Sequence, residues 1–123
     1  MEKTKIGIVG GLGHIGLVQA ACLAKLGYQT VAYDKNLTKV EKIFQGILPF
    51  FEAGLEEIVQ STIKNGLLHF TSSVRDLQES DIIFICVGTP SLPTGEADTS
   101  QVYAAVEEVA RNRNNHCLAA VKS

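Results

Sequence analysis

The chain has 123 residues, of which 46% are hydrophobic, 20% charged and 7% aromatic, and its formal net charge is −2. The high apolar fraction and small net charge exclude a disordered chain, and the length suits one domain with a substantial core. The faintly acidic balance, with no long basic run, excludes the electrostatic footprint of a nucleic-acid-binding protein. We therefore expect one folded domain, residues 1–123, without a nucleic-acid partner.

The apolar segments do not indicate a membrane span or a secretion signal. The apolar stretch after Lys3 and Lys5 is interrupted by glycines, and the run at 82–87 is far too short to cross a bilayer. The three cysteines, Cys22, Cys86 and Cys117, are odd in number and lack CxxC spacing. This pattern favours reduced, buried thiols over disulfides or a zinc site. We expect a cytoplasmic protein with no membrane partner and no metal.

Apolar runs of strand length alternate with segments of helical period. In chain order, the pattern predicts a strand at Ile6–Val9, a helix at 15–26, a strand at Thr30–Tyr33, helices at Leu37–Phe44 and 52–64, a strand at 67–70, a short helix from Ser72 or Ser73 to Leu77, a strand at 82–87, a helix at 101–110 and a strand at 117–121. Gly27 and Asn65-Gly66 are helix stops, and Thr99 or Ser100 is a candidate cap for the last helix.

Strands that are apolar on both faces and separated by helices predict a parallel sheet covered on both sides. Right-handed crossovers then give an α/β, doubly wound Rossmann sheet of about five strands in the order 3-2-1-4-5. The chain leaves no residues for a sixth strand, and its apolar end suggests that the natural protein continues beyond Ser123.

The segment Gly11, Leu12, Gly13, His14, Ile15 and Gly16 fits the pattern G-x-G-x-x-G. It follows a predicted strand and opens a predicted helix, and the next strand ends in an acid, Asp34, 18 residues after Gly16. This combination is the dinucleotide-binding fingerprint. Gly11 permits the tight turn, Gly13 lets a pyrophosphate approach the backbone, and Gly16 lets the helix pack close to the strand. A tight turn without a ligand is the alternative interpretation.

Asp34 bears on the choice of cofactor. Its carboxylate can accept hydrogen bonds from the adenosine ribose hydroxyls, and its charge would repel a 2′-phosphate. NAD is therefore favoured over NADP, although the neighbouring Lys35 weakens this inference.

A second cluster, Val87, Gly88 and Thr89, leaves the carboxyl end of the fourth predicted strand and continues into Pro90 and Pro93. Ligands bind beyond these strand ends in open α/β sheets, near the switch between the first and fourth strands. A rigid loop without a ligand explains the glycine and prolines equally well. The chain's three histidines are scattered, and no pattern indicates a catalytic residue.

Four stretches together resemble one family. They are the turn within 6–17, Asp34 with Lys39 five residues later, the segment 48–55, and 81–90 followed by Gly95, Ala97 and Asp98. The chain is similar to the N-terminal NAD-binding domain of the UDP-glucose/GDP-mannose dehydrogenases, the nucleotide-sugar dehydrogenases. It departs from the family at His14, where an aromatic residue is common, and at Ala53, where proline is usual.

The resemblance implies an NAD-dependent oxidoreductase that converts the C6 alcohol of a UDP-sugar to a carboxylate with two NAD, as in polysaccharide precursor synthesis. It implies that Lys39 and Thr89 contact NAD, together with the turn and Asp34. It also implies that Gly88 shapes the crevice and that the cluster of Val87, Gly88 and Thr89 belongs to the cofactor site. The family's nucleophilic cysteine, catalytic lysine and sugar-binding domain would lie beyond Ser123, so this chain alone is not expected to be catalytic. The full-length enzyme is expected to be a homodimer.

Two other functions stay open at this point. One is another Rossmann dehydrogenase of the hydroxyacid type, against which the segment 87–90 argues. The other is a stand-alone NAD-binding module with a regulatory role.

Overall fold

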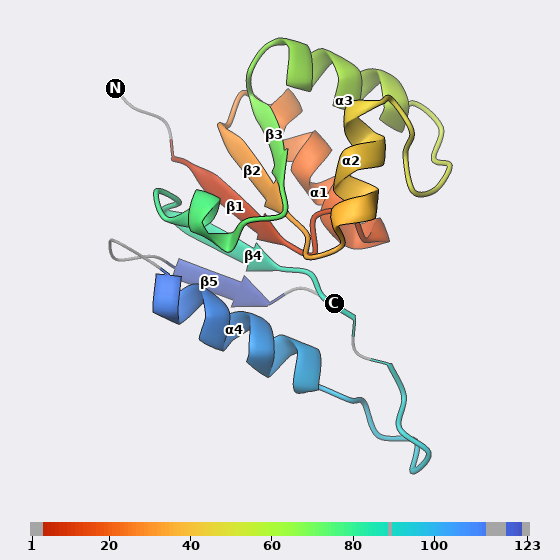
Figure 1. Cartoon of the computed structure of the whole chain (residues 1–123), viewed down its shortest axis with the longest axis vertical. Helices are drawn as coiled ribbons and strands as arrows, with labels where there is room; N and C mark the ends of the chain where they lie inside the picture. Colours follow the sequence, from red (N-terminus) through yellow and green to blue (C-terminus); the bar gives the residue numbers. More distant parts are fainter. Residues whose placement is uncertain (1–3, 89, 113–117, 122–123) are drawn as a thin grey trace.

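The computed structural model describes residues 4–88, 90–112 and 118–121. Five parallel strands form one sheet in the order β3-β2-β1-β4-β5, which confirms the predicted doubly wound topology (Figure 1). The strands are β1 (Ile6–Val9), β2 (Thr30–Tyr33), β3 (Leu68–Thr71), β4 (Ile82–Ile85) and β5 (Leu118–Val121). The helices are α1 (His14–Lys25), α2 (Leu37–Phe44), α3 (Leu55–Lys64), α4 (Ser100–Asn112) and the 3₁₀-helix η1 (Val74–Leu77).

Each face of the sheet is covered by its own group of helices. Helices α1, α2 and α3 lie on one face and α4 on the other (Figure 1). Successive strand residues alternate between the two cores, so Ile8 packs towards α1 while Val9 packs towards α4. This two-sided burial explains why the strands have continuous apolar runs.

Most predicted bounds agree with the structure to within one or two residues, and the differences have local causes. Helix α3 begins at Leu55 rather than at 52, because Gly54 adopts a left-handed conformation (φ +81°) that starts the helix there. Strand β4 ends at Ile85 rather than at 87, because its partner β1 leaves the sheet at Gly10, whose φ is +78°. The predicted first residue of β5, Cys117, lies outside the described residues. Of the other two cysteines, Cys86 is buried as predicted, but Cys22 is exposed because it lies on the face of α1 away from the core.

The capping of two helices differs from the prediction. Asp98, rather than Thr99 or Ser100, supplies the side chain at the start of α4, where its Oδ1 accepts from the Ser100 N–H at 2.9 Å. Hydrogen bonds from the backbone and the side chain of Ser100 hold the pKa of Asp98 below its usual range. Ser73 precedes η1, but its side chain caps no backbone group there. Gly27, as predicted, follows α1 with φ +100°.

Among the described residues, no helix combines the length and the apolar character needed to cross a bilayer.

Candidate dinucleotide-binding site

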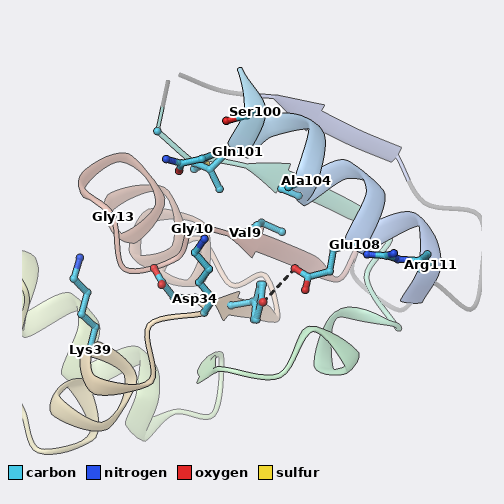
Figure 2. Close-up of a pocket in the computed structure, with 16 residues that line it drawn as sticks. Val9, Gly10, Gly13, Asp34, Lys39, Ser100, Gln101, Ala104, Glu108 and Arg111 are labelled. Carbon is cyan, nitrogen blue, oxygen red and sulfur yellow. Dashed lines mark hydrogen bonds between the residues drawn. The ribbon is translucent and has the colours of Figure 1, made fainter. Parts of the chain in front are cut away.

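A pocket of about 650 Å³ opens at the carboxyl ends of β1, β2 and β4, beside α4 (Figure 2). Its lining comes from the turn after β1, the end of β2, the start of α2, the segment after β4 and one face of α4. These segments are far apart in sequence and meet because parallel strands end at one edge of the sheet. The pocket therefore lies where the two predicted ligand-binding clusters converge.

The turn after β1 is closed by backbone hydrogen bonds. Gly11 N donates to Tyr33 O at 2.9 Å, which ties the turn to β2, and Gly13 N donates to Gly10 O at 3.1 Å. Gly10 was not among the predicted site residues, yet it lines the pocket. A Cβ at Gly10 would lie 2.8 Å from Cys86 O, so only glycine fits between β1 and the end of β4.

The three predicted glycines have different physical roles. A Cβ on Gly16 would lie 2.0 Å from Gly10 O, and one on Gly11 would lie 2.7 Å from the Ala32 Cβ. Both glycines are buried and are required by packing within the protein. Gly13 differs, because its φ is −75° and an added Cβ would meet only Gly10 O, at 3.4 Å. The protein itself has room for a side chain at Gly13, on the wall of the pocket.

Asp34 stands at the end of β2 and lines the pocket. Its Oδ2 accepts from Leu12 N at 3.1 Å and its Oδ1 accepts from Asn36 N at 2.9 Å. A carboxylate has about four lone-pair sites, so both oxygens retain acceptor capacity for a ligand. The two backbone donors thus fix the orientation of Asp34 without using up the carboxylate.

Lys39 reaches the same pocket from the first turns of α2 (Figure 2). Asn36 links this lysine to Asp34. The Asn36 backbone N–H donates to Asp34 Oδ1, and the Asn36 side-chain oxygen caps α2 by accepting from Lys39 N at 3.1 Å. Lys35 also lines the pocket. The two exposed lysines provide positive charge opposite an acidic ligand.

On the β4 side, Val87 and Gly88 line the pocket, and their contact with a cofactor stays a prediction. A Cβ on Gly88 would have Gln101 Oε1 as its nearest neighbour, at 3.8 Å, so this position also has open space. The predicted contact Thr89 lies outside the described residues.

Of the six predicted residues of the turn, Gly13 lines the pocket, and Gly11, Leu12, His14, Ile15 and Gly16 do not. Leu12 is buried in the core below α1, and Ile15 is partly exposed. His14 is exposed and its ring stacks on Phe50, with the centroids 4.5 Å apart and the planes at 29°. Any contact of these three residues with a dinucleotide stays a prediction.

Sequence reasoning missed the contribution of α4. Gln101, Ala104, Ala105 and Glu108 face the pocket and are spaced i, i+3, i+4 and i+7, the spacing of one helical face. The spacing shows in the sequence that these residues share one face of a helix, but no motif marks that face as part of a binding site. Arg111 lines the pocket one turn beyond this face.

The hydroxyl of Tyr33 joins β2 to α4 by donating to Glu108 Oε1 at 3.2 Å, the dashed line in Figure 2. Burial, reinforced by the negative charge and hydrogen bond of Glu108, raises the pKa of Tyr33 to about 12. The phenol therefore remains a protonated donor over the whole physiological range.

The geometry of the pocket defines the class of the protein. A helix N-terminus at a glycine turn, an oriented carboxylate on the next strand and lysines beside it are the groups that hold a dinucleotide in a Rossmann domain. The open side of Gly13 leaves space where the fingerprint places the pyrophosphate, so the residues present fit NAD.

Comparison with known proteins identifies the family. The model of the UDP-glucose/GDP-mannose dehydrogenase family, NAD binding domain, matches residues 4–123, and the chain belongs to this family. It is 40% identical over 115 residues to UDP-glucose 6-dehydrogenase of Rhizobium meliloti (strain 1021), which covers 92% of this chain and 26% of the relative. The chain thus spans about a quarter of the length of the curated relatives it matches.

Solved structures of nucleotide-sugar dehydrogenases share the fold. A UDP-glucose dehydrogenase from the archaeon Pyrobaculum islandicum superimposes with a TM-score of 0.92 at 36% identity, over 99% of this chain and 29% of that one. A GDP-mannose dehydrogenase from Pseudomonas aeruginosa gives 0.89 at 34% identity, over 98% and 28%. NAD is the cofactor of this family's domain.

Proposed function

We propose that the pocket between the β1 turn and α4 binds NAD, with Gly13 against the pyrophosphate and Asp34 on the adenosine ribose. Lys39, Val87 and Gly88 would contact the same molecule from the pocket walls. The observation that carries the proposal is the open side of Gly13. Neither its φ nor its neighbours require glycine, and it lies at a helix N-terminus beside Asp34.

We propose further that the whole protein is a nucleotide-sugar 6-dehydrogenase acting on a UDP-sugar. Bound NAD supplies the hydride acceptor, and the residues of this chain bind and orient it. Support comes from the relatives, which include UDP-glucose 6-dehydrogenases from several bacteria. A homodimer in the cytoplasm belongs to this proposal, and light scattering of the protein in solution tests the dimer.

Calorimetric titration of the chain with NAD and with NADP tests the binding site. We expect NAD to bind more tightly, because the Asp34 carboxylate repels a 2′-phosphate. In Asp34→Asn we expect NAD affinity to fall about tenfold and the preference over NADP to shrink, since a hydrogen bond to a charged group contributes about 1.5–3 kcal/mol.

Asp81→Asn is the matched control. Asp81 also accepts a backbone hydrogen bond, from Lys5 N at 2.8 Å, but it precedes β4 at the opposite end of the strands. Equal NAD affinity in the wild type and Asp34→Asn would overturn the role of Asp34. A loss of the same size in Asp81→Asn would show that the effect is general damage to the sheet.

A further inference from the structure

Glu108 is placed beside the proposed nucleotide site by a residue of β2. Tyr33 directly precedes Asp34, and its hydroxyl donates to Glu108 Oε1 at 3.2 Å. The Glu108 carboxylate therefore lies one tyrosine side chain away from the strand end that carries Asp34. Both acids line the same pocket, and Glu108 is half-buried in it (Figure 2).

One oxygen of the Glu108 carboxylate, Oε2, is available to accept a hydrogen bond from a ligand. Tyr33 occupies Oε1, and within the described residues no other group donates a hydrogen bond to the Glu108 side chain. Arg111, one turn further along α4, pairs with Glu107 instead, at 3.7 Å. Because the phenol of Tyr33 stays protonated, it holds Glu108 in place at any physiological pH and leaves Oε2 for a ligand.

The walls next to Glu108 suit a flat, apolar ring. Val9 of β1 and Ala104 of α4 face the pocket (Figure 2), and Ala105 also lines it. Val9 and Ala105 are buried, so these three residues supply small apolar side chains to the pocket wall. With the ribose on Asp34, the base attached to that ribose must occupy a neighbouring part of the pocket. A planar ring between small apolar side chains would then present its polar edge to a carboxylate.

We propose that Glu108 selects adenine at this end of the dinucleotide by accepting a hydrogen bond from the purine 6-amino group. The inference rests on the proposed NAD site and adds a specificity-determining residue to it. A carboxylate only accepts hydrogen bonds, so it pairs with an amino group and repels the keto oxygen of a 6-oxopurine. Leaving such a polar group without its partner weakens binding, and this mismatch produces the discrimination.

The test is the ratio of affinities for NAD and for nicotinamide hypoxanthine dinucleotide, in which the 6-amino group is replaced by oxygen. Both ligands carry the same charge, so a general change in electrostatics cancels in the ratio. By calorimetry we expect the wild-type chain to prefer NAD by about tenfold, the effect of one hydrogen bond to a half-buried charged group. In Glu108→Gln we expect the preference to fall to about twofold or less, because an amide offers both a donor and an acceptor.

Glu107→Gln is the matched control, one residue earlier on the exposed surface of α4, and it should keep the wild-type ratio. Glutamine at position 108 retains an acceptor for Tyr33, and an unchanged thermal midpoint would show that α4 is still in place. An unchanged ratio in Glu108→Gln, or an equal loss in Glu107→Gln, would overturn the role of Glu108 and leave the NAD site standing. Failure of the wild-type chain to bind NAD would overturn both proposals.

Discussion

Two connections leave adjacent strands and border the same pocket, but they are built differently. The turn after β1, residues 10–13, is short. A Cβ added at Gly10 or Gly11 would lie within 3 Å of other backbone or side-chain atoms. In the longer connection from β4 to α4, the described residues 90–99 are mostly exposed and fold back on themselves. A small hairpin closes there, with Leu92 N donating to Glu96 O and Asp98 N to Pro90 O, both at 2.7 Å.

The difference shows that some glycines of this chain are required by packing and others by their own backbone conformation. In the first connection, contacts with β2 and β4 make glycine necessary for folding. In the second, Gly95 has φ +88° and nothing within 4 Å of an added Cβ, so only its own backbone conformation favours glycine. Packing therefore excludes a side chain at Gly10 and Gly11, whereas the surroundings of Gly95 leave room for one.

The largest effect is expected where helix α1 packs against the first connection, in Gly16→Ala. The new Cβ would lie 2.0 Å from Gly10 O, which is backbone and cannot move aside without separating α1 from β1. We expect a loss of about 3 kcal/mol or more in the free energy of unfolding, measured by urea denaturation. Gly88→Ala in the second connection should cost far less, and equal losses would contradict the distinction.

A matched pair compares the two connections at nearly the same backbone angle. Gly10 has φ +78° and Gly95 has φ +88°, but only Gly10 has a close neighbour, Cys86 O at 2.8 Å from the added Cβ. We expect Gly95→Ala to cost about 1 kcal/mol of conformational strain, and Gly10→Ala to cost about 2 kcal/mol more from the clash. Denaturation midpoints of the two variants give the comparison. A similar cost in both would mean that strain, rather than packing, limits the turn.

Gly13→Ala separates ligand binding from folding within the turn itself. Since an added Cβ meets only Gly10 O at 3.4 Å, we expect stability to change by less than about 1 kcal/mol, the usual range for glycine and alanine at a helix N-cap. NAD affinity should fall by roughly tenfold or more, because the methyl group occupies space needed by the pyrophosphate. Calorimetry and denaturation on the same variant measure both quantities. Unchanged affinity would contradict the proposed position of the pyrophosphate.

The smallest effect concerns the link that joins β2 to α4. The pKa of Tyr33 is raised from 10.0 to about 12, so the folded state retains this proton at pH values where the unfolded chain loses it. The contribution to stability is fully present below pH 10 and is lost as the pH rises towards about 12. In Tyr33→Phe the decline in thermal midpoint over this interval should be shallower. An equally steep decline would show that another group causes it.

Much of the fold could be predicted because it depends on local patterns. The alternation of apolar runs and helical segments was sufficient to predict the sheet order, and Gly11 to Gly16 with Asp34 indicated the edge of the sheet at which we propose that NAD binds. The helix caps were less predictable, because Asp98 competes with Thr99 and Ser100 and only the path of the loop decides among them. No motif in the sequence singles out Glu108, because the spacing that places it on one face of α4 is shared by every amphipathic helix.

The amino-acid sequence by itself determined the class of fold, the strand order and the place of the glycine turn after β1, since these follow from periodicity and from residue types with special backbone freedom. Only the tertiary structure decided which glycines serve packing and which leaves room for a ligand. It also decided that Tyr33 and Glu108, 75 positions apart, meet at the pocket. Such pairings depend on how strands and helices are juxtaposed in space, and no local pattern in the chain encodes a distance between two side chains.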